Sequence, residues 1–118
     1  MVENNVYRIA LPIKIKSRNK LDRQHWAEKR RNKKTYALLI RNQMRLRKVP
    51  KAKEEKHTLI ITSYRKRKLD PDNLVGGCKQ LIDALVDEDF IFDDSAKYID
   101  LQVEQHKAPE NLTIITRV

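Results

Sequence analysis

Residues 57–64 have the β-branched apolar core of a strand, and apolar and polar residues alternate in three further stretches, at residues 7–16, 98–105 and 112–117. This period of two is typical of β-strands that have one buried face. Pro12 lies in the stretch 7–16, so we expect that strand to run along a sheet edge or to contain a bulge. Because only a short loop, residues 107–111, separates the last two stretches, we expect them to form a closing hairpin.

Two other stretches have helical spacing. Residues 22–48 contain neither Gly nor Pro and begin with Asp22, an N-cap residue type, so we predict one long helix there, strongly basic on its outer side. We interpret Trp26 as a core anchor of this helix rather than as a platform for base stacking. The apolar stripe of this helix is sparse and consists of Trp26, Tyr36, Leu39, Ile40, Met44 and Leu46.

A second helix is predicted over residues 72–86. Its apolar residues recur at i, i+4, i+7, i+8 and i+11, which places them on one buried face: Leu74, Cys78, Leu81, Ile82 and Leu85. Residues 90–92 are a short apolar link, either a small strand or a turn. The predicted order is β-α-β-α-β-β, an α+β fold with two main helices and a mixed sheet. The length of 118 residues fits one domain, spanning residues 1–118.

The charge distribution favours nucleic acid as the partner. The chain has 26 Lys and Arg against 16 Asp and Glu, a formal net charge of +10. Between Arg8 and Lys51 the only acids are Asp22 and Glu28. Ribosomal or membrane-surface association would also explain this excess. We expect non-specific phosphate contacts from Arg18, Lys20, Arg23, Lys29, Arg30, Lys33, Lys34, Arg65, Lys66, Arg67 and Lys68.

Several classes of protein are excluded. With Cys78 as its one cysteine, the chain can form neither an internal disulfide nor a cysteine-rich zinc site, and its three histidines are scattered. No apolar run approaches the ~20 residues of a membrane helix. Residues 1–5 lack the basic and apolar regions of a signal peptide. We therefore expect a cytoplasmic protein with no membrane partner and no small organic cofactor.

A group of carboxylates is the strongest chemical signal. Asp70 and Asp72 flank Pro71, which biases Asp70 toward extended backbone. On an extended segment, side chains at i and i+2 point the same way, so both can reach one cation. Asp94, next to Asp93, is expected to return after the second helix as a third ligand. Such oxygen ligands suit Mg²⁺, with Mn²⁺ as a substitute, and an acidic site in a basic protein suggests a nuclease.

Lys79 adds to this signal because it shares a helical face with Asp72 and Asp83, opposite the buried stripe. We therefore expect its ammonium group to point toward the carboxylates, where it would stabilise negative charge at a scissile phosphate. Gly76 and Gly77 weaken the helix, and the expected reason is the close approach of another backbone or of DNA.

Each motif also has a purely structural interpretation. Residues 70–73 form a common turn and capping sequence, and residues 93–95 are most often a loop. Lys79 and Asp83 can be a surface ion pair, residues 65–68 a solvated run of charge, and Cys78 a small core residue. The functional interpretation depends on their conjunction: a run of cations, two acids, a helix with an aligned lysine, and two more acids.

This conjunction resembles the RusA-like crossover-junction endodeoxyribonucleases, the Holliday-junction resolvases of phages and prophages. The pattern is D-x-D-N-L from Asp70, K-x-x-x-D-A-L from Lys79 and I-x-D-D-S from Ile91, and the likeness spans about residues 15–105. The sequence departs from the family at Glu88 and Asp89, where many relatives have a small residue and glycine.

The resemblance implies a Mg²⁺-dependent homodimer that cuts four-way DNA junctions by paired, symmetric nicks. The positions that the family's site residues would occupy are Asp70, Asp72 and Asp94 for metal binding and catalysis, Lys79 for the essential lysine, and Asp93 and Asn73 in support. Three alternatives remain open. They are a nucleic-acid-binding module without catalysis, a nuclease for other branched DNA such as flaps or forks, and a small basic adaptor whose acidic segment binds a protein.

Overall fold

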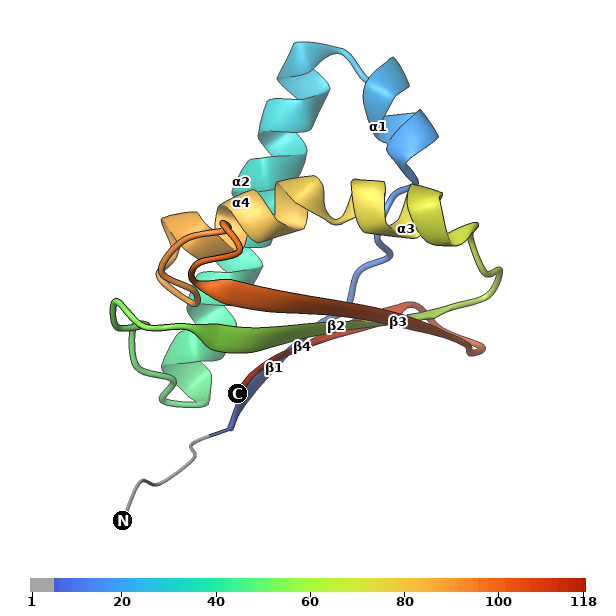
Figure 1. Cartoon of the computed structure of the whole chain (residues 1–118). Helices are drawn as coiled ribbons and strands as arrows, with labels where there is room; N and C mark the ends of the chain where they lie inside the picture. The colour runs from blue at the N-terminus through green and yellow to red at the C-terminus, as the bar shows by residue number, and fades with distance from the viewer. Residues whose placement is uncertain (1–5) are drawn as a thin grey trace.

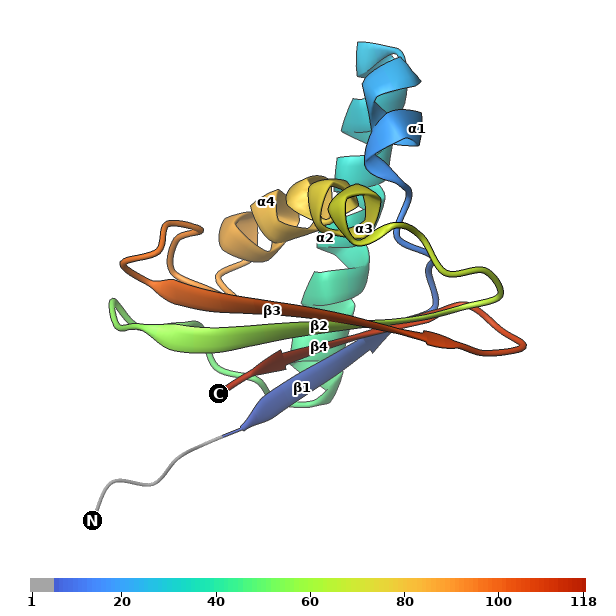
Figure 2. The ribbon, with the colours of Figure 1, turned by 45° about the vertical axis from the view of Figure 1, so that its right-hand side comes forward.

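A four-stranded mixed sheet forms one layer of the structure, and the helices cover one of its faces (Figure 1, Figure 2). The computed structural model describes residues 6–118. The sheet order is β1-β4-β2-β3, in which β4 is antiparallel to β1 and β2, and β2 is parallel to β3. This architecture confirms the expected α+β class and mixed sheet. The strands are β1 (Tyr7–Leu11), β2 (His57–Arg65), β3 (Ile99–Lys107) and β4 (Leu112–Arg117).

Alternation along the strands determines which side chains face the helices. In β2, Leu59, Ile61 and Ser63 are buried, whereas Ile60 and Thr62 between them are only half-buried. β1 is an edge strand, as expected, but it is shorter than residues 7–16. It ends just before Pro12, because proline has no backbone N–H for the ladder.

The hairpin expected from the last two strands is wrong, because β2 lies between β3 and β4. The short loop that joins them passes the end of β2, where the Ala108 N–H donates a hydrogen bond of 2.9 Å to the carbonyl oxygen of Arg65. A short loop ordinarily predicts neighbouring strands. Here the helical connection after β2 has already placed β3 parallel to it, so the last strand pairs on the other side of β2.

The first predicted helix consists of two, α1 (Arg18–Arg23) and α2 (Trp26–Leu46). The Ser17 hydroxyl caps α1 by accepting from the Lys20 N–H at 3.1 Å. The His25 ring caps α2 by accepting from the Ala27 N–H at 3.3 Å. Asp22 is therefore not the N-cap that the pattern predicted, because it lies inside α1. Two side-chain caps so close together favour two helix starts over one.

The buried face of α2 contains Tyr36, Ile40 and Met44. Trp26 is 63% exposed and Leu46 is 72% exposed. The interpretation of Trp26 as a core anchor is therefore wrong. The predicted stripe is too long at both ends, because the N-terminal end of α2 extends past α3 and α4 (Figure 1) and Leu46 is the exposed last residue of the helix.

The second predicted helix also divides, into α3 (Pro71–Gly77) and α4 (Lys79–Asp87), with Cys78 at the junction. The prediction of its buried stripe is confirmed, since Leu74, Cys78, Leu81, Ile82 and Leu85 are all buried. Residues 90–92 form turns rather than a strand. Within this segment Phe90 and Ile91 are fully buried.

Gly77 packs directly on the segment that leads from β1 to α1. A Cβ atom added to Gly77 would lie 1.9 Å from the Lys16 carbonyl oxygen, so the expected close approach of another backbone is confirmed there. A Cβ at Gly76 would instead meet the flexible Arg18 side chain, 2.6 Å from its Cδ. This contact places Arg18, the first residue of α1, against the last turn of α3.

Candidate functional site

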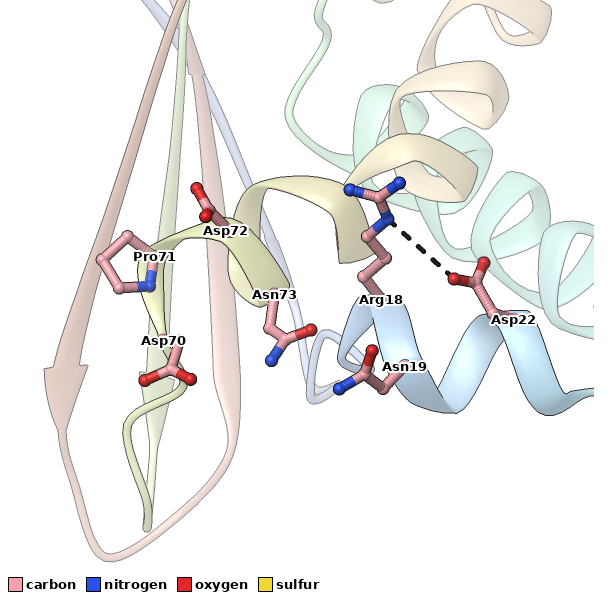
Figure 3. A pocket seen from close by; sticks show the side chains of 7 residues that line it. All are labelled: Arg18, Asn19, Asp22, Asp70, Pro71, Asp72 and Asn73. Atoms are coloured by element: carbon pink, nitrogen blue, oxygen red, sulfur yellow. Dashed lines mark ion pairs between the residues drawn. The ribbon is translucent and has the colours of Figure 1, made fainter.

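An open pocket of about 700 Å³ lies where α1 meets the start of α3 (Figure 3). Arg18, Asn19 and Asp22 line it from α1, and residues 70–73 line it from the other side. Arg18 Nε lies 3.9 Å from the Asp22 carboxylate in an exposed ion pair. The pocket thus brings the predicted ligands Asp70 and Asp72 together with one of the predicted phosphate-binding cations.

Asp70 and Asp72 differ in backbone geometry. Asp70 is the extended N-cap of α3 (φ −57°, ψ 142°), Pro71 follows it at the start of the helix, and Asp72 lies in the first turn. Figure 3 shows their carboxylates on opposite sides of Pro71. The expectation that they point the same way from an extended segment is therefore wrong. Proline suits the first helical position, so the helix starts before Asp72, and helical residues turn by about 100° each.

Lys79 and Asp94 line a second pocket, of about 400 Å³. Lys79 is the first residue of α4, and Asp94 lies in the turns between α4 and β3. Val75 of α3 and Ile99 of β3 contribute apolar surface to the same pocket. Lys79 thus shares a pocket with one predicted ligand, Asp94. The other two predicted ligands, Asp70 and Asp72, line the first pocket.

The Asp93 carboxylate is engaged within its own turn. A hydrogen bond from the Ser95 hydroxyl, and then one from the Asp94 backbone, lower the pKa of Asp93 below its ordinary value. These interactions hold Asp93 within the loop that also carries Asp94.

The predicted metal ligands have suitable chemistry for Mg²⁺ but do not all lie close together. Carboxylate oxygens suit Mg²⁺, which takes few ligands from protein and retains waters, so the donor chemistry of Asp70, Asp72 and Asp94 fits this ion. Within residues 6–118, however, no three His, Cys, Asp or Glu side chains lie close enough together to hold a metal ion. The structure therefore supplies suitable donors in two neighbouring pockets without gathering all three.

Most of the predicted phosphate-binding cations lie on α1, on α2 and in the loop after β2. Lys33 forms an ion pair with Asp87, at 3.2 Å. Lys29 and Lys33 are half-buried, and the exposed members are Arg18, Lys20, Arg23, Arg30, Lys34, Lys66, Arg67 and Lys68.

Arg65 is the exception, because it is only 5% exposed. Its Nη1 donates to the Ile15 carbonyl oxygen at 2.9 Å and its Nε to the Arg67 carbonyl oxygen at 2.6 Å. Burial lowers the pKa of its guanidinium group. The expectation that Arg65 contacts phosphate is therefore wrong. The alternation of β2 turns this residue toward the buried face, where it ties β2 to the segment before α1.

Besides Pro71, which lies between two predicted ligands, the first pocket contains two residues that were not predicted as site residues, Asn19 and Asp22. The signal for them is Ser17, since a helix capped there places Arg18 and Asp22 at i and i+4 on one face. The apolar members of the second pocket had no sequence signal beyond ordinary helix and strand periodicity.

No protein-family model matches the chain, and no curated protein matches it in sequence. Of the helices between Val6 and Val118, none is both long and apolar enough to cross a bilayer.

Proposed function

We propose that this protein is a Mg²⁺-dependent, structure-selective endodeoxyribonuclease of the RusA-like type that resolves four-way DNA junctions, with Mn²⁺ as a possible substitute. The observation that supports it best is the composition of the first pocket. There Asp70 and Asp72 lie beside α1, a helix that also carries phosphate-binding cations. A nuclease needs both features at one place, since a polyanion must be held next to the groups that activate its cleavage.

In this proposal Asp70, Asp72 and Asp94 would hold the metal ion, for which the carboxylates of the two pockets would have to come together. The ion would supply the charge that activates the scissile phosphate and an attacking water. Lys79, in the pocket that Asp94 lines, places its ammonium group to stabilise negative charge on the phosphate oxygens. Asn73 and Asp93 support the ligands on either side. The exposed cations of α1 and α2 bind the DNA backbone without reading sequence.

The RusA-like type also implies the assembly. A homodimer with a two-fold axis would present two such sites to a two-fold symmetric junction, which explains paired symmetric nicks. The cytoplasm of a bacterial or phage-infected cell is the compartment in which we place this activity.

A nucleic-acid-binding module without catalysis is the second candidate. One observation favours it: across residues 6–118 the predicted ligands are not gathered into a three-residue metal site. Such a protein would bind junctions through the same cations and would not cut the junctions in Mg²⁺ or in Mn²⁺.

Cleavage of a synthetic four-way junction, with and without Mg²⁺, separates these candidates. Linear duplexes of the same sequences and a flap substrate serve as controls. We expect symmetric, Mg²⁺-dependent nicks confined to the junction. Equal cutting of the flap would reassign the substrate to other branched DNA, and binding without cuts in Mg²⁺ or Mn²⁺ would favour the binding module.

Asp72→Asn is the variant that tests the site. It removes one ligand charge while keeping the size of the side chain, so we expect it to abolish cleavage and to leave junction binding in a gel-shift assay unchanged. Asp89→Asn is the matched control, because Asp89 lies just after α4, at the opposite end of the α3–α4 pair. Cleavage by Asp72→Asn at the wild-type rate would show that the site is elsewhere.

A further inference from the structure

Trp26 is a large aromatic residue whose exposure the proposed function does not use. It is the first residue of α2, and its 63% exposure leaves most of the indole ring in contact with solvent. Single exposed apolar residues are common on protein surfaces, so exposure alone indicates nothing. The surroundings of this ring are the informative part.

Two side chains hold the Trp26 ring in place. The Arg30 guanidinium carbon lies 5.3 Å from the ring centroid, one helical turn along α2, in a cation–π contact. The His25 ring lies 5.5 Å from it at an interplanar angle of 38°. A ring held by neighbours on its own helix loses less side-chain entropy when a ligand stacks on it.

The charge around Trp26 selects the kind of ligand. We define the basic arm as residues 18–34, which comprise α1, the bend and the first part of α2. Its acids are Asp22 and Glu28, and Asp22 is already paired with Arg18. The remaining charges are cations, so the arm attracts a polyanion and repels a basic partner.

The basic arm also projects from the body of the molecule. In both views its bend rises above the layer formed by α3 and α4 (Figure 1, Figure 2). Its other end borders the pocket of Asp70 and Asp72 through Arg18 and Asn19. A ligand held along the arm therefore lies beside the pocket at one end and reaches Trp26 at the other.

We propose that Trp26 stacks on an unpaired base of the bound DNA. This inference rests on the DNA binding of the proposed function but not on cleavage. Paired bases inside a duplex are already stacked and offer no free face, whereas a base at a branch or bulge does. Aromatic side chains on a cationic surface bind such bases without sequence preference, because every base has a π-face. Trp26 would thereby favour branched over fully paired DNA.

Tryptophan fluorescence tests this directly, because Trp26 is the only tryptophan in the chain. Three DNAs are compared: a duplex with one unpaired thymine, the same duplex with an abasic residue at that position, and the fully paired duplex. We expect strong quenching by the first alone. Equal quenching by the abasic duplex would mean that the ring senses only phosphate binding, and would overturn the inference.

Three variants extend the test to affinity. Trp26→Ala should weaken binding of the bulged duplex about tenfold and leave binding of the paired duplex unchanged. Trp26→Phe should restore most of the loss, since it keeps an aromatic face. Leu46→Ala is the matched control, an exposed apolar residue at the far end of α2, and should change neither affinity.

The remaining outcomes separate the inference from the proposed function. Normal junction cleavage together with an unchanged affinity of Trp26→Ala for the bulged duplex would overturn base stacking and leave the nuclease standing. Absence of binding to all three DNAs and to the junction would overturn both. Quenching by poly-glutamate as strong as that by the bulged duplex would assign the surface to an acidic protein partner instead.

Discussion

Gly77 and Gly76 are adjacent in α3 but make different contacts. At Gly77 the neighbour is the backbone of Lys16, whereas at Gly76 it is the side chain of Arg18, from Cβ at 2.9 Å to Cδ at 2.6 Å. The first contact fixes where the chain enters α1, and so where Arg18 and Asn19 stand in the pocket. The two glycines therefore have different importance for the candidate site.

Gly77→Ala should accordingly lower the free energy of unfolding by at least about 2 kcal/mol, because the added methyl group would displace backbone. Urea denaturation measures this loss. Gly76→Ala is the comparison and should destabilise less than Gly77→Ala. The Arg18 Cδ can rotate away, the 2.9 Å contact with Arg18 Cβ requires only a small shift of α1, and alanine favours the helix. Equal effects of the two substitutions would contradict the packing described for α3.

At this scale the sequence predicted which residues lie around the first pocket better than it predicted the directions of their side chains. The pattern D-P-D-N selects Asp70, Asp72 and Asn73, and the structure places all three around one pocket. It did not predict that the carboxylates diverge, because that depends on whether Pro71 ends an extended segment or begins a helix. Arg65 shows the same limit. Its place in a run of cations suggested an exposed side chain, but it lies at the same period-two spacing as the buried residues of β2.

Among the elements, α4 ends in an unusual way. Asp89 follows it with φ of 62°, in the left-handed region that favours glycine. The Asp89 carboxylate forms only an exposed ion pair with Lys51, at 3.6 Å.

Asp89→Gly should therefore raise the free energy of unfolding by up to about 1 kcal/mol, because relief of backbone strain exceeds the weak ion pair. Thermal and urea unfolding measure it. Glu88→Gly should have the opposite sign, since Glu88 has φ of −95° and its carboxylate accepts from Arg41 Nε at 2.7 Å. If Asp89→Gly destabilises as well, strain at this helix end is not significant.

The number and type of elements followed from periodicity, but their divisions and partners did not. Ser17 and His25 cap two separate helices within the first predicted helix, and the spacing of its apolar residues does not indicate these capping hydrogen bonds. Residues 98–105 and 112–117 alternate as strands should, yet alternation does not encode which strand lies next to which. Pairing depends on long-range contacts, and here the connection through α3 and α4 decided it.

Across the described residues, charge is segregated between the basic arm and residues 83–94, which contain six acids and no Lys or Arg. Binding to duplex DNA should then weaken steeply with salt, because each neutralised phosphate releases counterions. Lys34→Gln should reduce the slope of log K against log salt by about 1, the effect of losing one phosphate contact. Lys53→Gln, an exposed lysine beyond the other end of α2, should leave the slope unchanged. Affinity titrations at several salt concentrations measure both slopes, and equal slopes would contradict the arm as the DNA-binding surface.

The central position of β4 has a consequence for how the protein is made. β1 pairs with β4 and with no other strand of the sheet, and within this pair Arg8 lies opposite Thr116, 108 residues later in the chain. At translation speeds of about 5–20 residues per second, the interval between synthesis of these two residues is roughly 5–20 seconds. During this interval β1 is an unpaired, partly apolar strand edge. Nascent chains halted before Leu112 should therefore be much more sensitive to protease in β1 than chains extended past Arg117 and freed from the ribosomal tunnel.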